Sequence, residues 1–192
     1  MESNFRRCLT FVFAREGGYS DDPRDPGGAT NLGITIATLG AWRGHPVTPQ
    51  DVRALRKADA ARIYHAMYWQ AAYCGELPSG VDLLVFDAAV NLGVERSLDF
   101  LRAQAGIGVP VRHRRHSRHP HPGLTPQTEQ HLRDMLARLC VPAVIEGLCG
   151  RRTDFYRRLS GFRTFGAGWL KRVRLARDLA MHLWVTGGTG IP

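Results

Sequence analysis

Residues 16–35 read EGGYSDDPRDPGGATNLGIT, and this stretch decides how the N-terminal part of the chain folds. Before it, the apolar residues of segment 5–13 recur with a period of about 3.6 residues, which predicts a helix. Two glycines follow Glu16, and such a pair is a helix-stop signal, so we expect Glu16 at the end of this helix. Pro, Gly and Asp crowd the next stretch, which predicts a short irregular or β-hairpin loop over 19–33.

The rest of the sequence predicts a mainly α-helical fold, because apolar residues keep helical spacing and alternating runs of Val, Ile and Thr are nearly absent. TPQD at 48–51 supplies an N-cap, a first-turn proline and an acid at the third position. It predicts helices that extend to about Gln70, broken near Lys57. SGVD at 79–82 repeats this capping pattern before a buried central helix that Gly93 closes. Further amphipathic segments are predicted at 126–147, 150–160 and 166–185.

Composition limits the class of protein. The 192 residues carry 26 Lys and Arg against 17 Asp and Glu, and this charge of +9 suits a polyanion such as nucleic acid, anionic lipid or cell wall. No apolar run is long enough to span a membrane, and the N-terminus lacks the pattern of a signal peptide. The four cysteines lie far apart and predict buried thiols rather than a metal site.

A change of character near 94–97 predicts two regions, 1–95 and 96–192. In the second region, GIGVPVRHRRHSRHPHPG at 106–123 has no core-forming period. We therefore expect a basic loop rich in His and Arg at 112–122. Prolines interrupt its histidines and no other ligands accompany them, so no metal site is expected there.

Glu16, Asp25 and Thr30 follow one another in an order that suits two-carboxylate glycoside hydrolysis. A glutamate partly buried at a helix end favours its protonated form and can act as a general acid. An aspartate in a solvated loop stays ionised and can activate water. Thr30 then orients that water, and Tyr19 offers a ring face to a sugar. The residues alone leave open a second interpretation, in which the acids only cap turns beside prolines.

Several further motifs occur in a fixed order along the chain. They are LRKADA at 55–60, YW at 68–69, LPSG at 77–80, VFDAAVNLG at 85–93 and FGAGW at 165–169. Together with EGGYSDDPRDPGGATNLGIT, these motifs resemble glycoside hydrolase family 108, the N-acetylmuramidases of phage endolysins and related secretion-activator proteins. The resemblance covers most of the chain.

The resemblance implies a lysozyme-like helical fold, with 1–95 as the catalytic region and 96–192 as a predicted peptidoglycan-binding region. It implies that Glu16 is the catalytic acid and that no cofactor is needed. The order of Glu16, Asp25 and Thr30 is also similar to that of phage-type lysozymes, which invert the anomeric centre with the aspartate as base.

Other residues are candidates for substrate binding. Asp87 and Asn91 share one face of the central helix, where they would hydrogen-bond an N-acetyl group or, alternatively, fix helix packing as a polar pair. Tyr68 and Trp69 follow a helix end and would form a sugar-stacking rim or, alternatively, part of the core.

The sequence therefore predicts an N-acetylmuramidase that hydrolyses the β-1,4 bond between N-acetylmuramic acid and N-acetylglucosamine in peptidoglycan. The alternatives are a lytic transglycosylase and a non-catalytic peptidoglycan-binding protein. A nucleic-acid-binding module has only the basic charge and the Arg/His loop in its favour, so no specific nucleic acid is expected. Synthesis in the cytoplasm, followed by a holin or secretion machinery for export, would bring the protein to the wall in the periplasm.

Overall fold

The computed structural model describes residues 4–22, 27–107, 130, 134 and 140–187. The chain forms two compact units. Residues 6–67 make the first, which we call the hairpin unit; residues 1–5 and 68–192 make the second, which we call the helical unit. This division into compact units differs from the expected boundary between residues 95 and 96. The assignment of 1–95 to catalysis and of 96–192 to peptidoglycan binding stays a prediction. Within the described residues, no helix is both long and apolar enough to cross a membrane.

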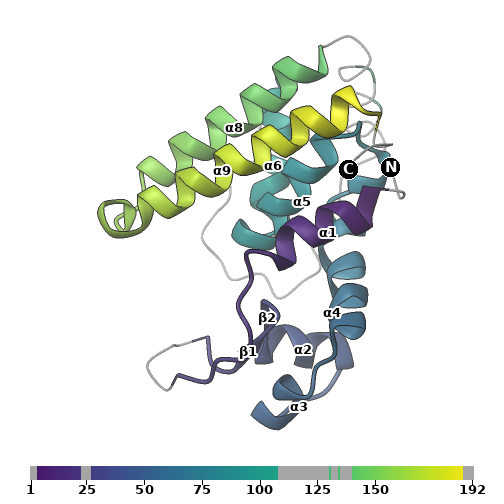
Figure 1. Ribbon diagram of the computed structural model, residues 1–192, viewed down its shortest axis with the longest axis vertical. Helices are drawn as coiled ribbons and strands as arrows, with labels where there is room; N and C mark the ends of the chain where they lie inside the picture. Colours follow the sequence, from purple (N-terminus) through teal and green to yellow (C-terminus); the bar gives the residue numbers. More distant parts are fainter. Residues whose placement is uncertain (1–3, 23–26, 108–129, 131–133, 135–139, 188–192) are drawn as a thin grey trace. The chain divides into compact units, whose positions relative to one another are not determined.

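The hairpin unit combines short helices with one antiparallel hairpin (Figure 1). Its elements are α1 (Phe5–Phe13, whose first residue belongs to the helical unit), β1 (Thr30–Asn31), β2 (Ile34–Thr35), α2 (Ile36–Arg43), α3 (Pro49–Arg53) and α4 (Lys57–Tyr64). Thr30 pairs with Thr35 in the hairpin, and Leu32 and Gly33 form the turn with φ angles of 52° and 76°. Positive φ at both turn positions gives the twist that a two-residue hairpin needs. The hairpin expected after the first helix is confirmed.

Local signals set most helix ends of this unit. Thr48 accepts the N–H of Asp51, and the Asp51 carboxylate accepts the N–H of Thr48 at 2.9 Å, so the predicted capping box is present. The helix breaks between Arg53 and Lys57, as predicted. The first helix ends at Phe13, earlier than the glycine pair, because the next residues form a turn.

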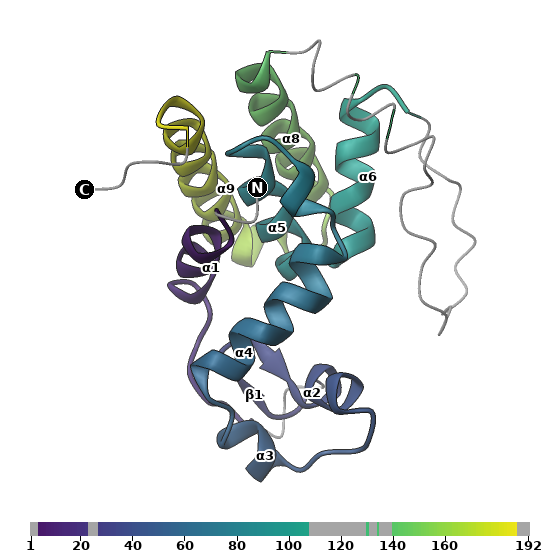
Figure 2. The same cartoon turned by 90° about the vertical axis from the view of Figure 1, so that its right-hand side faces the viewer.

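The helical unit contains the longer helices (Figure 2). Its elements are η2 (His65–Gln70, a π-helix that begins in the hairpin unit), η3 (Cys74–Glu76, a 3₁₀ turn), α5 (Val81–Leu92), α6 (Val94–Gln104), α8 (Val141–Arg157) and α9 (Phe162–Val185). Helices α8 and α9 pack side by side, and α5 packs against α6, α8 and α9. This arrangement confirms the mainly α-helical, lysozyme-like fold class.

Helix α5 is the centre of the core, because every residue from Val81 to Ala89 is buried. Its N-terminus differs from the serine cap that the sequence suggests: Asp82 Oδ1 accepts the N–H groups of Gly80 and Leu83 at 2.8 and 2.7 Å. Ser79 instead donates to a carbonyl of α9. Gly93 closes α5 with a φ of 88°, as predicted.

The remaining expectations have mixed outcomes. The expected break between 147 and 150 is wrong, because α8 runs continuously from Val141 to Arg157. Most of 126–140 and the loop at 112–122 lie outside the described residues. The segment expected at 166–185 is α9. Three cysteines are buried thiols as expected, but Cys140 is exposed.

Candidate active site

Glu16 lies just beyond α1 in the hairpin unit, and its side chain is partly buried. Its backbone N–H donates to the Val12 carbonyl at 3.2 Å, so the last turn of α1 still fixes its position. The sequence predicts this placement at the end of the first helix. The catalytic role of Glu16 stays a prediction.

Gly33 and Tyr64 bring the hairpin turn and α4 against Glu16. A Cβ atom at Gly33 would lie 2.9 Å from both Cγ and Oε2 of Glu16, and 2.2 Å from the Tyr64 hydroxyl oxygen. That hydroxyl donates to the Leu32 carbonyl at 3.0 Å, and the Tyr64 ring meets Phe13 edge to face. The Glu16 carboxyl group is therefore packed against backbone that only glycine can supply. Sequence reasoning did not place Gly33 or Tyr64 in the site, although a glycine two residues after a strand is a signal for such a turn.

Thr30 lies on β1 in the same unit as Glu16. Its backbone N–H and carbonyl both bond Ser20 at 2.8 Å, and its hydroxyl donates to the Gly28 carbonyl at 3.3 Å. A hydroxyl that donates keeps lone pairs that can accept a hydrogen from water. This orientation suits the expected role of Thr30. Asp25 lies outside the described residues, so its role as base stays a prediction.

Tyr19 is partly buried, and its surroundings restrict how it can meet a sugar. The hydroxyl donates to Asp21 at 3.1 Å, and the guanidinium carbon of Arg53 lies 4.2 Å from the ring centroid. Arg53 therefore covers one face of the ring, and only the other face is available for a ligand.

Asp87 occupies the centre of a buried ion cluster in the helical unit. Arg152 from α8 and Arg172 from α9 both bond its carboxylate, with Arg172 Nη2 at 2.8 Å and Arg152 Nη1 at 2.5 Å. Burial by itself raises the pKa of Asp87, but the two guanidinium charges outweigh burial and hold that pKa below its ordinary value. The Asp87 side chain has 0% exposure, so the structure corrects the substrate-binding prediction in favour of helix packing.

Asn91 lies one turn after Asp87 and is exposed. Its Oδ1 accepts the hydroxyl of Tyr156 and, at 3.5 Å, the Nη2 of Arg152. These bonds orient the side-chain amide, whose Nδ2 is a donor. Asn91 stays a predicted substrate-binding residue, now with a fixed orientation.

Trp69 is fully buried, which corrects its predicted place in a sugar-stacking rim. Its ring packs edge to face against Phe5 and Phe86, each with centroids 5.4 Å apart, in the core of the helical unit. The alternative interpretation as a core residue therefore holds for Trp69. Tyr68 is only partly buried, and its role at a rim stays a prediction.

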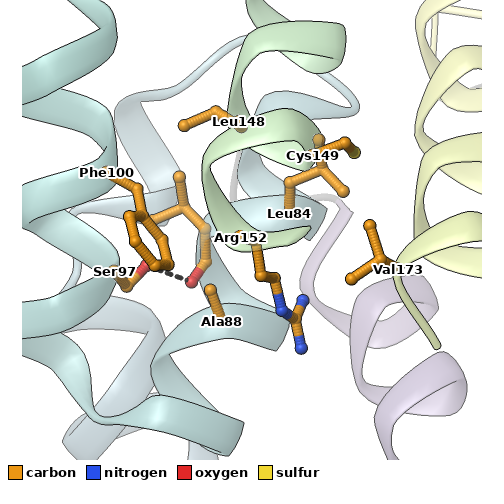
Figure 3. A pocket seen from close by; sticks show the side chains of 9 residues that line it. Leu84, Ala88, Ser97, Phe100, Leu148, Cys149, Arg152 and Val173 are labelled. Carbon is orange, nitrogen blue, oxygen red and sulfur yellow. Dashed lines mark hydrogen bonds between the residues drawn. The ribbon is translucent and has the colours of Figure 1, made fainter. Parts of the chain in front are cut away.

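A small cavity lies beside Arg152 among α5, α6, α8 and α9, as Figure 3 shows. Its volume of ≈ 10 Å³ leaves room for about one water molecule and excludes a sugar. Ser97 on its wall is satisfied by the Val85 carbonyl. Burial raises the pKa of Cys149, also on the wall, to about 12, so this thiol stays protonated near neutral pH and is no nucleophile.

In the part of the chain that the structure describes, no three His, Cys, Asp or Glu side chains are grouped to hold a metal ion. The histidines of the loop at 112–122 lie outside that part.

Comparisons with known proteins place these features in a family. Residues 9–93 match the model of glycosyl hydrolase 108. The solved structure of Brucella abortus SagA is 33% identical, with a TM-score of 0.78, over 96% of this chain and 97% of that chain. The chain belongs to glycosyl hydrolase family 108. No curated protein matches it.

Membership of family 108 makes the protein a glycoside hydrolase of the peptidoglycan-degrading type. The family match includes the second half of α1, the hairpin and α5, and its range contains both Glu16 and Gly33. The family resemblance found in the sequence is thus confirmed.

Proposed function

We propose that this family 108 enzyme hydrolyses the β-1,4 bond between N-acetylmuramic acid and N-acetylglucosamine, with Glu16 as the general acid. The observation that carries the proposal is the packing of the Glu16 carboxyl group against Gly33 and beside Tyr64. A carboxyl group held on one side by backbone and a phenol has a fixed direction, which general acid catalysis requires.

The proposed reaction is a single displacement. Glu16 gives its proton to the glycosidic oxygen while the bond from that oxygen to C1 of N-acetylmuramic acid breaks. Asp25 takes a proton from water, and the water oxygen bonds to C1 from the opposite face, which inverts the anomeric centre. The hydroxyl of Thr30 accepts a hydrogen of that water and orients it. Exchange of protons with solvent then restores both carboxyl groups.

The protein would reach this substrate in the periplasm after release through a holin-like pore or export by a secretion machinery.

The test is mass spectrometry of the fragments that purified sacculi release, with wild type compared with Glu16→Gln. Glutamine keeps the shape of glutamate and has no proton to transfer. Glu76→Gln is the matched control, because it makes the same change at an exposed position in the helical unit.

We expect wild type and Glu76→Gln to release fragments that end in reducing N-acetylmuramic acid, and Glu16→Gln to release at least about 10²-fold less. Fragments with anhydro ends would refute hydrolysis and show that the enzyme is a lytic transglycosylase. Sacculi that bind the protein but release nothing with wild type would refute the enzyme mechanism and leave a wall-binding protein.

A further inference from the structure

Helices α6 and α8 of the helical unit border a surface groove with a volume of ≈ 290 Å³. Helices α6 and α8 pack against each other (Figure 2), and residues of both helices line the groove. Its walls are formed by Arg96, Asp99, Phe100, Ala103, Arg151, Asp154, Phe155 and Arg158. This volume is close to the lower limit of ordinary ligand sites.

Both acids of the groove form ion pairs with arginines that do not line it. Asp99 pairs with Arg102 at 3.2 Å, and Asp154 pairs with Arg157 at 3.5 Å. Within the described part of the chain, none of the three lining arginines forms an ion pair with an acidic side chain. The groove therefore presents an excess of positive charge.

Two of these arginines are held in place by neutral partners. Arg151 donates to the Ala103 carbonyl at 2.8 Å and to Gln104 Oε1 at 3.2 Å. Gln104 is itself fixed, because it lies against Gly147 so closely that a Cβ there would be 2.2 Å from Oε1. Arg96 lies over the Phe155 ring, 4.7 Å from its centroid. Guanidinium groups held without an anion are preorganised to bind one.

The groove also has an apolar part. Phe100 from α6 and Phe155 from α8 meet edge to face with centroids 5.9 Å apart. Arginines beside aromatic rings suit a ligand that combines an anionic group with small apolar groups.

We propose that this groove binds the peptide stems of peptidoglycan through their carboxylates. The inference rests on the proposed function for the substrate polymer, whose glycan strands carry short peptides with free carboxylates and methyl side chains. The lining arginines take the carboxylates, and the two phenylalanine rings take the methyl groups. The groove lies in the helical unit, whereas Glu16 lies in the hairpin unit, so peptide binding and bond cleavage have separate residues.

The test uses the whole protein and two synthetic probes: the tripeptide L-alanyl-γ-D-glutamyl-L-lysine, and the same peptide with its carboxylates amidated. Binding is measured by isothermal titration calorimetry at physiological salt. The variants are Arg151→Gln and Arg158→Gln. The matched control is Arg174→Gln, which removes the same charge from an exposed position on α9 outside the groove.

We expect the free-acid peptide to bind, the amidated peptide to bind at least about tenfold more weakly, and each groove variant to lose about fivefold in affinity. Arg174→Gln should bind like wild type. Equal binding of both peptides, or an equal loss in Arg174→Gln, would overturn the proposal in favour of general charge attraction. No binding of the free-acid peptide would also overturn it.

Hydrolysis separates this proposal from the proposed function. The groove variants should degrade intact sacculi more slowly than wild type and degrade peptide-free glycan strands at the wild-type rate. If wild type cuts neither substrate, the proposed hydrolase function is refuted. The peptide-binding proposal is not affected by that result, because calorimetry compares the two peptides without any cleavage. Equal loss on both substrates would overturn the groove as a peptide site.

Discussion

Replacing Gly33 by alanine tests how the fold holds Glu16. The new methyl group would enter at a φ of 76° and meet the Tyr64 hydroxyl at 2.2 Å and the Glu16 carboxyl group at 2.9 Å. We expect both a loss of stability and a loss of activity, because the same atoms carry the turn and the proposed catalytic acid.

The stability cost has two parts. Left-handed backbone costs a residue with a Cβ about 1–2 kcal/mol, and forcing a methyl group into packed atoms costs about 1–3 kcal/mol. Gly33→Ala should therefore lower the free energy of unfolding by about 3 kcal/mol, which lowers Tm by roughly 6–12 °C for a chain of this size. Gly44→Ala is the matched control: its φ is 74°, and nothing lies within 4 Å of the new Cβ. Gly44→Ala should lose only the stability that the left-handed backbone costs, about 1–2 kcal/mol.

The assay is urea and thermal unfolding followed by circular dichroism, together with the release of fragments from sacculi. Displacement of Glu16 should reduce release by about 10²-fold in Gly33→Ala, whereas Gly44→Ala keeps wild-type release. Combining Gly33→Ala with Tyr64→Phe removes the oxygen that the methyl group meets. The double variant should be more stable than the sum of the single changes by about 1 kcal/mol.

Two results would refute this reasoning. If Gly33→Ala unfolds like Gly44→Ala and stays fully active, Gly33 is not packed against Glu16 and Tyr64. If the stability changes of the two single variants simply add in the double variant, the methyl group introduced at position 33 does not contact the Tyr64 hydroxyl.

Further predictions concern the helical unit. Asp87→Asn leaves buried Arg152 and partly buried Arg172 without their anion and should cost about 3–5 kcal/mol in urea unfolding. Asp154→Asn, at an exposed pair, should stay within about 0.5 kcal/mol of wild type. The pKa of Asp87 is lower in the folded protein than in the unfolded chain, where an aspartate has a pKa of ~3.9. The ionised Asp87 therefore stabilises the fold fully at pH values above the unfolded pKa, and this stabilisation is lost as pH falls through the folded pKa. Wild-type urea midpoints should thus fall below about pH 4, and Asp87→Asn should lack that component; identical pH profiles would contradict the assignment. A maleimide at pH 8 should label exposed Cys140 in the native protein and buried Cys149 only after unfolding, as mass spectrometry of peptides would show; rapid native labelling of Cys149 would contradict its burial.

The sequence predicted much of the fold because local signals fix many element ends. The capping box at Thr48 and the glycine that closes α5 are decided by residues within one turn of each other. The serine cap at Ser79 failed because Ser79 is drawn to a carbonyl of α9, 104 residues away along the chain. Competition from distant partners is invisible to local patterns.

The sequence by itself determined the helical class, the hairpin after the first helix, the position of Glu16 at the end of that helix, and the family. Spacing on one helix face could not decide whether Asp87 meets substrate or core, because the answer depends on Arg152 and Arg172 from two other helices. The same holds for the packing of Gly33 against Glu16 and for the arginine groove between α6 and α8. Burial, ion pairing and close backbone approach join residues far apart in the chain, so only the tertiary structure decides them.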